Sequence, residues 1–310
     1  MEGGRTVYID PKARELLENG KKNPTYILPI DDARAAMKAF QTTNRVLEDM
    51  KEVGDFSVPT LHGPVTVRRY IPEEVDRNRA FIFIHGGGWC LNSIDTADEI
   101  CRYLAKRMRR IVFSIEYRLA PEYKYPAGLE DCVDAVQWIF DNSAKLDVDP
   151  AHIAIGGDSS GAQFSAVLCL YFRDRGGVQL EKQILIYPST DYWLPGLPSL
   201  TENDPYSIVD RNFVIWAWNN YLGPDFDRND PYLFPLRAVS LSNLPPAIVI
   251  TADCDPLRDE GIRYAEKMEA DGSTVRLINY RGMMHGFFLK YRLFEQAEQA
   301  IADVVDFLKD

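Results

Sequence analysis

The sequence has few basic side chains for its length, few histidines and no long apolar run. Its 310 residues include 35 lysines and arginines against 46 aspartates and glutamates, which gives a formal net charge of −11. Nucleic acids and anionic membrane surfaces are bound through basic patches, so this balance argues against both as partners. A membrane-spanning helix needs roughly 18 or more apolar residues in a row, and no such run occurs.

Cysteine is sparse, and its spacing fits neither a disulfide framework nor a metal site. The five cysteines are odd in number, widely separated and without a CxxC pair: Cys90, Cys101, Cys132, Cys169 and Cys254. We expect reduced core cysteines, no metal ion and no organic cofactor. The N-terminal segment also lacks the apolar core and the small-residue cleavage site of a signal peptide, which favours a cytoplasmic location.

Short apolar runs alternate with helical patterns along most of the chain. Two alternating segments, 55–60 and 65–71, are joined by a turn and predict an antiparallel hairpin. Amphipathic helical patterns separate most of the later runs, so the sequence predicts an α/β fold with about eight strands, mostly parallel. These runs are continuous, as in strands buried on both faces of a parallel sheet: 80–84, 111–115, 152–155, 183–187, 247–250 and 275–279.

One long segment interrupts this alternation. Residues 190–245 contain no clear strand pattern, and they are too many for a simple loop between two strands of one sheet. The segment is either additional core or a lid over a ligand site, and its place between two late strands favours the lid. It is rich in large aromatic side chains: Trp193, Tyr206, Phe213, Trp216, Trp218 and Tyr221.

The central chemical motif is Gly157–Gly161, with the sequence Gly-Asp-Ser-Ser-Gly. It follows the apolar run at 152–155 and precedes a helical pattern at 162–171, and strand, sharp turn and helix are the context of a nucleophile elbow. Larger residues two positions before and after the serine would clash in so tight a turn. The turn lifts Ser159 to the edge of the sheet and to a helix N-terminus, where the dipole favours developing negative charge.

Asp158, next to the nucleophile, points away from the reaction site if the elbow forms. We expect a structural role for this carboxylate, with Arg118 or Tyr117 from the neighbouring loop as its partner.

A triple-glycine segment, His85–Trp89, directly follows the apolar run at 80–84. Without side chains, the glycines leave backbone N–H groups free to approach an oxyanion closely. A phosphate-binding loop is the alternative. That loop would continue with Lys-Ser/Thr or as GxGxxG, and neither continuation follows.

A nucleophilic serine needs a base, and the base needs an orienting carboxylate. Of the four histidines, only His285 follows a late strand, so it can meet Ser159 at the edge shared by all loops that leave parallel strands. The acid is expected in the loop after the preceding strand, where Asp253, Asp255 and Asp259 compete. The order Ser, Asp, His is the order expected for this fold.

Together, these motifs make the sequence resemble the hormone-sensitive lipase family of bacterial carboxylesterases, which have the α/β-hydrolase fold and carry HGGG and GDSAG motifs. The resemblance implies a catalytic triad of Ser159, Asp255 and His285, because Asp255 belongs to the family's Asp-Pro-Leu motif. It extends over nearly the whole chain and is carried by five segments: 85–88, 117–122, 157–161, 255–261 and 285–287.

The resemblance also implies an oxyanion hole. It would consist of the Ser160 N–H and two glycine N–H groups, either Gly86 and Gly87 or Gly87 and Gly88. Two positions depart from the family pattern: Ser160 stands where alanine is usual, and Ala162 where glycine is usual. Ser160 still supplies a backbone N–H, and its hydroxyl could perturb selectivity.

In this family a cap is built from N-terminal helices and from an insertion after the sixth strand. The resemblance therefore implies a cap made of residues 1–53 and 190–245, over a catalytic domain made of 54–189 and 246–310. The residues predicted to contact substrate lie in the aromatic insertion or directly after the glycines: Trp89, Tyr206, Trp216 and Trp218.

The sequence thus predicts a serine carboxylesterase that hydrolyses short-chain esters of small molecules, acetyl to hexanoyl, through an acyl-enzyme. Its layout is most similar to the short-chain acetyl esterases of the family. The alternatives are an amidase, peptidase or deacetylase on the same fold, and a non-catalytic ligand receptor that would lack a triad member. The expected partner is a small-molecule ester, without nucleic acid or membrane, and a homodimer is left open.

Overall fold

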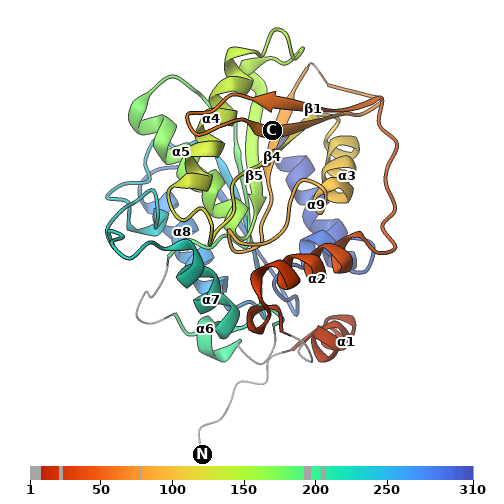
Figure 1. The fold of residues 1–310 in the computed structure, drawn as a ribbon, viewed down its shortest axis with the longest axis vertical. Coiled ribbons are helices and arrows are strands. Elements are labelled where there is room, and N and C mark those ends of the chain that lie inside the picture. The colour runs from red at the N-terminus through yellow and green to blue at the C-terminus, as the bar shows by residue number, and fades with distance from the viewer. Residues whose placement is uncertain (1–7, 21–23, 77, 192–196, 204–206, 310) are drawn as a thin grey trace, which may run out of the picture.

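Eight strands form one mixed sheet in the computed structural model, which describes residues 8–20, 24–76, 78–191, 197–203 and 207–309 (Figure 1). The strand order is β1-β2-β4-β3-β5-β6-β7-β8; the β1–β2 and β2–β4 pairs are antiparallel and the others are parallel. The strands are β1 (Glu52–Val58), β2 (Val65–Ile71), β3 (Ala80–Ile84), β4 (Ile111–Glu116), β5 (Ile153–Asp158), β6 (Gln183–Ile186), β7 (Ala247–Ala252) and β8 (Val275–Tyr280).

Helices cover both faces of the sheet. Apolar side chains of α3 and α9 pack against one face, and those of α4, α5 and α8 pack against the other. The described helices are α1 (Pro11–Gly20), α2 (Ile30–Thr42), α3 (Asp98–Met108), α4 (Ala127–Asp141), α5 (Ser160–Arg175), α6 (Ser199–Glu202), α7 (Arg211–Tyr221), α8 (Arg258–Ala270) and α9 (Glu295–Phe307). The predicted α/β architecture, with its hairpin and six further strands, is confirmed.

The expectation of burial on both faces holds for the central strands and is wrong for β8. Residues of β3, β5 and β7 are buried along their whole length, whereas Arg276, Leu277 and Asn279 of β8 are exposed. The reason is topological, because β8 pairs only with β7 and ends the sheet.

The sequence pattern of residues 11–53, polar with spaced apolar positions that include Val46, Leu47 and Met50, predicts helix, and this prediction holds only in part. Helix α2 ends at Thr42, and Asn44 then takes a left-handed backbone conformation with φ +58°. From there to β1 the chain contains no helix, so the apolar residues Val46, Leu47 and Met50 are not on a helical face. His152 also differs from its predicted place at the start of a strand, since it ends a short 3-10 turn before β5.

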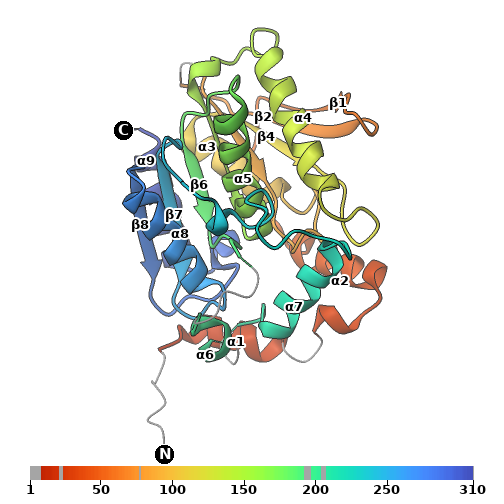
Figure 2. The same ribbon diagram turned by 90° about the vertical axis from the view of Figure 1, so that its left-hand side faces the viewer.

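The N-terminal helices and the helices of the 190–245 insertion lie at the same end of the sheet. Figures 1 and 2 both show α1, α2, α6 and α7 gathered there, away from the β1–β2 hairpin. Helix α7 lies directly on the glycine segment, since a Cβ built on Gly88 would come 2.7 Å from the Ala217 Cβ. The division into a cap and a catalytic domain at the stated boundaries stays a prediction.

Candidate active site

The turn around Ser159 has the backbone of a nucleophile elbow. Strand β5 ends at Asp158, Ser159 has φ +54°, and α5 begins at Ser160. A Cβ on Gly157 would come 2.2 Å from the Ile84 carbonyl oxygen, and one on Gly161 only 2.0 Å from it. Both flanking glycines are therefore required, and the strained serine is held at the N-terminus of a helix.

Three side chains from three loops meet in one hydrogen-bonded line. His285 Nε2 lies 3.0 Å from Ser159 Oγ, and His285 Nδ1 lies 2.7 Å from Asp255 Oδ2. Asp255 is fully buried, and its other oxygen accepts a hydrogen bond from the Leu257 N–H at 2.8 Å. A buried carboxylate in this position fixes the imidazole so that Nε2 faces the serine hydroxyl.

The two competing aspartates are committed elsewhere. The Asp253 carboxylate accepts a hydrogen bond from the Asn279 side chain at 3.2 Å, at an exposed position. Asp259 pairs with Arg258 at 2.8 Å and accepts the Ser199 N–H. Of the three aspartates that the sequence left open, the structure brings only Asp255 to the histidine.

Tyr187 is a residue near the site that the sequence reasoning missed. Its ring lies 4.5 Å from the His285 imidazole, centroid to centroid, and it is 1% exposed. Its backbone has φ +37°, a conformation that non-glycine residues rarely adopt. The available signal was its place directly after β6, at the same sheet edge as Ser159 and His285.

The glycine segment is fastened at its start by Asp158. The Gly86 N–H donates to Asp158 Oδ1 at 2.9 Å, so this amide is already occupied. The expected partners of Asp158 are wrong: Arg118 pairs instead with Asp131, and the Tyr117 hydroxyl donates to the His85 carbonyl oxygen. Burial raises the pKa of Asp158 to about 6, although the Gly86 bond favours its ionised form.

The next two amides of the segment are differently placed. Gly87 and Gly88 have φ +117° and +59°, and neither N–H donates to any acceptor in the described chain. The Ser160 N–H, in the first turn of α5, likewise has no acceptor among the described residues. Gly87, Gly88 and Ser160 therefore have free N–H groups in the described chain, whereas Gly86 does not.

Two of the aromatics predicted to contact substrate are buried behind the glycine segment. Trp89 is 2% exposed, stacks on Tyr221 at 4.5 Å and donates from Nε1 to Gln163. Trp218 is 1% exposed and packs against Trp89 and Phe234 at 4.2 and 5.3 Å. Both rings belong to the core and do not line an open wall, because their neighbours enclose them.

The other two predicted aromatics have different outcomes. Trp216 is half-buried and lies 5.5 Å from the Phe213 ring on α7. Phe213 itself is close to the glycines, since a Cβ on Gly88 would come 3.5 Å from its ring. The sequence gives Phe213 no signal beyond its place in the aromatic insertion. Tyr206 lies outside the described residues.

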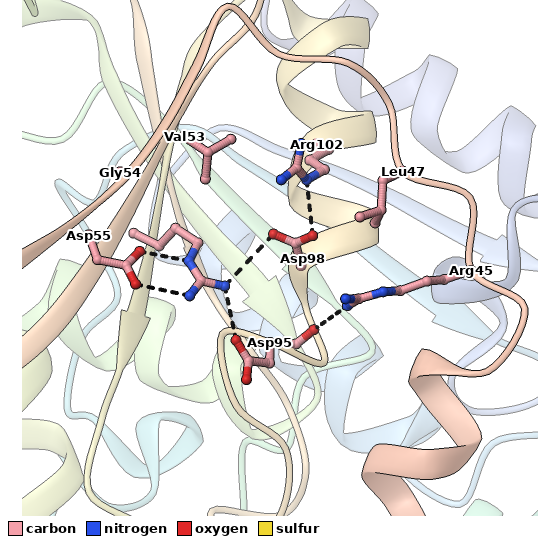
Figure 3. A pocket seen from close by; sticks show the side chains of 9 residues that line it. Arg45, Leu47, Val53, Gly54, Asp55, Asp95, Asp98 and Arg102 are labelled. Carbon is pink, nitrogen blue, oxygen red and sulfur yellow. Dashed lines mark hydrogen bonds and ion pairs between the residues drawn. The ribbon is translucent and has the colours of Figure 1, made fainter.

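A separate pocket of about 480 Å³ lies between the β1–β2 hairpin and the start of α3 (Figure 3). Its walls are charged: two of its three arginines form ion pairs within it, and the third, Arg45, donates to the Asp95 carbonyl oxygen at 3.0 Å. Arg68 contacts Asp55 and Asp95 at 2.7 and 3.0 Å, and Arg102 contacts Asp98 at 2.9 Å. None of the residues predicted to form the site lies here. The ion pairs join the hairpin to the segment that follows the glycines.

Two searches of the described residues gave no candidate. No described group of histidine, cysteine, aspartate or glutamate side chains is arranged to hold a metal ion. No helix in the described ranges is both long and apolar enough to cross a bilayer.

Comparisons with known proteins identify the fold and the family. A family model described as the alpha/beta hydrolase fold matches residues 81–289. Carboxylesterase NlhH of Mycobacterium tuberculosis is 39% identical over 285 residues, which cover 90% of this chain and 88% of that protein. Ethyl acetate hydrolase of Pseudomonas putida is 29% identical over 299 residues, covering 94% and 93%.

A solved structure extends the likeness to the whole fold. A hyperthermophilic esterase from the archaeon Pyrobaculum calidifontis superposes with a TM-score of 0.91 at 34% identity, covering 98% of both chains. The chain therefore belongs to the α/β-hydrolase family, in its hormone-sensitive-lipase branch, and is a carboxylic ester hydrolase.

Proposed function

We propose that the protein is a serine carboxylesterase that cleaves short-chain esters of small molecules through an acyl-enzyme. The observation that carries this proposal is the hydrogen-bonded line from Ser159 through His285 to the buried Asp255. His285 takes the serine proton as Oγ attacks the ester carbonyl carbon, and Asp255 stabilises the imidazolium that forms. The alcohol leaves with that proton, and a water activated by His285 then releases the acid.

The negative charge that develops on the carbonyl oxygen needs donors that are already in place. The free N–H groups of Gly87, Gly88 and Ser160 are the donors in this proposal, because Gly86 is bonded to Asp158. Donors fixed before the reaction stabilise the transition state without having to reorganise during it.

Preference for short acyl chains is the finer part of the proposal. Phe213 and Ala217 of α7 lie against Gly88, so groups attached to a carbonyl held there meet this helix face at once. Each methylene that fits should contribute about 0.8 kcal/mol, until the enclosed space ends. The relative named ethyl acetate hydrolase supports this range, since its name describes an acetyl ester. A cytoplasmic location stays a prediction from the sequence, and the oligomeric state stays open.

The test is a panel of p-nitrophenyl esters from acetate to palmitate, with wild type and Ser159→Ala. We expect kcat/KM to peak between acetate and hexanoate, and kcat of the variant to fall by about 10⁵ or more. A fluorophosphonate probe should label wild type and not the variant, while their thermal unfolding curves agree.

Three outcomes would count against this function. A Ser159→Ala protein that retains a tenth of the wild-type turnover would remove the nucleophile assignment. A preference for palmitate would remove the chain-length limit. Faster turnover of a matched amide than of the ester would favour an amidase.

A further inference from the structure

The two residues that flank the nucleophile each hold one end of the glycine segment. Asp158 Oδ1 accepts the Gly86 N–H at 2.9 Å, and Ser160 Oγ accepts the Trp89 N–H at 3.3 Å. Gly87 and Gly88, whose N–H groups are free in the described chain, lie between these two attachments. The position of the free amides relative to Ser159 therefore depends on both bonds.

The Trp89 end is the more strained of the two. Gly87, Gly88 and Trp89 all have positive φ, and only Trp89 carries a side chain, at φ +60°. A non-glycine residue in the left-handed region relaxes unless its surroundings hold it there. Trp89 is 2% exposed, so water does not readily replace a lost partner for its N–H.

The indole ring of Trp89 is held separately from its backbone. The ring stacks on Tyr221 with an angle of 5° between the planes, and its Nε1 donates to Gln163 at 3.2 Å. Among the described residues, Ser160 Oγ is the acceptor of the backbone N–H. Removing the Ser160 hydroxyl would therefore take away the acceptor of the Trp89 N–H, while the ring and the Trp89 carbonyl oxygen, which accepts the Ala120 N–H at 2.9 Å, stay anchored.

Ser160 is also next to the nucleophile, so a small displacement at this residue would change the geometry around Ser159. It is the first residue of α5, is 1% exposed and directly follows the nucleophile.

We propose that Ser160 is a positioning residue for the oxyanion hole. Its hydroxyl fixes the backbone of Trp89 and so sets the position of the Gly88 N–H relative to Ser159 Oγ. This inference rests on the proposed function, because it concerns the same reaction.

The test compares Ser160→Ala with a matched control in the same helix. Ser165→Ala also removes a fully buried hydroxyl, but one whose bond within the described ranges is to the Gly161 carbonyl oxygen of α5, at 2.8 Å. Ser160→Thr is the rescue variant, since it keeps an oxygen on Cβ. For each protein, kcat and KM on p-nitrophenyl acetate are measured together with the inhibition constant of a trifluoromethyl ketone and the thermal unfolding midpoint.

The ketone reports on the oxyanion hole directly. Ser159 Oγ adds to its carbonyl carbon, the serine proton passes to His285 Nε2, and the carbonyl oxygen becomes a bound oxyanion. For Ser160→Ala we expect kcat to fall about tenfold and the ketone inhibition constant to rise by about the same factor. KM should change less than about twofold, because the ground-state ester places no charge in the hole. Ser160→Thr should recover most of the loss.

Several results would overturn the inference. One is a Ser160→Ala enzyme with wild-type kcat and ketone affinity, while the wild type itself is active. Another is a loss of kcat that Ser165→Ala reproduces, since general loosening of α5 would then explain it. A wild-type protein that neither cleaves the ester nor binds the ketone would overturn the proposed function as well.

Discussion

Asp255 differs from the neighbouring aspartates in what its two oxygens contact. One faces His285 Nδ1 at 2.7 Å and the other accepts a backbone N–H, with no exposure to water. We expect Asp255→Asn to lower kcat by about 10⁴, because an amide no longer stabilises the imidazolium or its productive tautomer. Asp253→Asn and Asp259→Asn serve as controls and should cost less than about tenfold.

Steady-state kinetics of the three variants on p-nitrophenyl acetate gives the ranking. If Asp253→Asn or Asp259→Asn proves the most damaging, the acid in the proposed mechanism is misassigned.

Sequence reasoning named Ser159, Asp255 and His285, which the structure brings together, but it did not resolve the contacts of their neighbours. Spacing alone left three aspartates open, and the resemblance selected Asp255. The two pairs of glycines left open by the sequence differ in whether they include Gly86, and the structure bonds the Gly86 N–H to Asp158, 72 positions along the chain. Such a bond follows from the pairing of β3 with β5, which no local pattern encodes.

The aromatic side chains of helix α7 have two different places in the structure: Phe213 contacts the glycine segment, and Trp218 is part of the core. Phe213 lies over Gly88, whereas Trp218 is enclosed by Trp89 and Phe234. We expect Phe213→Ala to move the optimum of kcat/KM by two or more carbons toward longer acyl chains, with a small loss of stability. Trp218→Ala should instead lower the free energy of unfolding by about 3–5 kcal/mol, as expected for a large buried ring.

The acyl-ester panel and urea unfolding, applied to both variants, distinguish these effects. An unchanged chain-length profile for Phe213→Ala would show that α7 does not bound the acyl site.

At the level of elements, prediction succeeded where tertiary structure adds little to the local pattern. The runs at 65–71 and 80–84 coincide with β2 and β3, because continuous or alternating apolar residues bounded by turns are readable locally. For the 190–245 insertion, the sequence showed only an aromatic-rich composition. Its helices pack on a loop more than a hundred residues earlier, so the burial of Trp218 and the approach of Phe213 could not be read from the insertion alone.

For the molecule as a whole, two buried groups near the site give opposite pH dependences of stability. Burial lowers the pKa of His85 to about 4, so on acidification the unfolded chain takes up this proton first and stability falls. Burial raises the pKa of Asp158 to about 6, so the folded chain takes up that proton first and stability rises. Both changes fall between about pH 6.5 and 4 and partly cancel.

Asp158→Asn removes only the second of these contributions. The amide oxygen can still accept the Gly86 N–H, so the glycine segment keeps its attachment. We expect the free energy of unfolding of the variant to fall more steeply than that of the wild type between pH 6.5 and 4, as measured by urea unfolding. Parallel curves for the two proteins would contradict the raised pKa of Asp158.

All five thiols are enclosed in the folded chain. Cys90 directly follows the glycine segment, is fully buried, and burial raises its pKa to about 12, so it is neither exposed nor ionised at neutral pH. A thiol-alkylating reagent can then reach these cysteines only when the chain opens. The rate at which each cysteine is modified therefore reports how often the chain around it opens. For Cys90, that rate reports the opening of the glycine segment, whose position is fixed in the proposed mechanism.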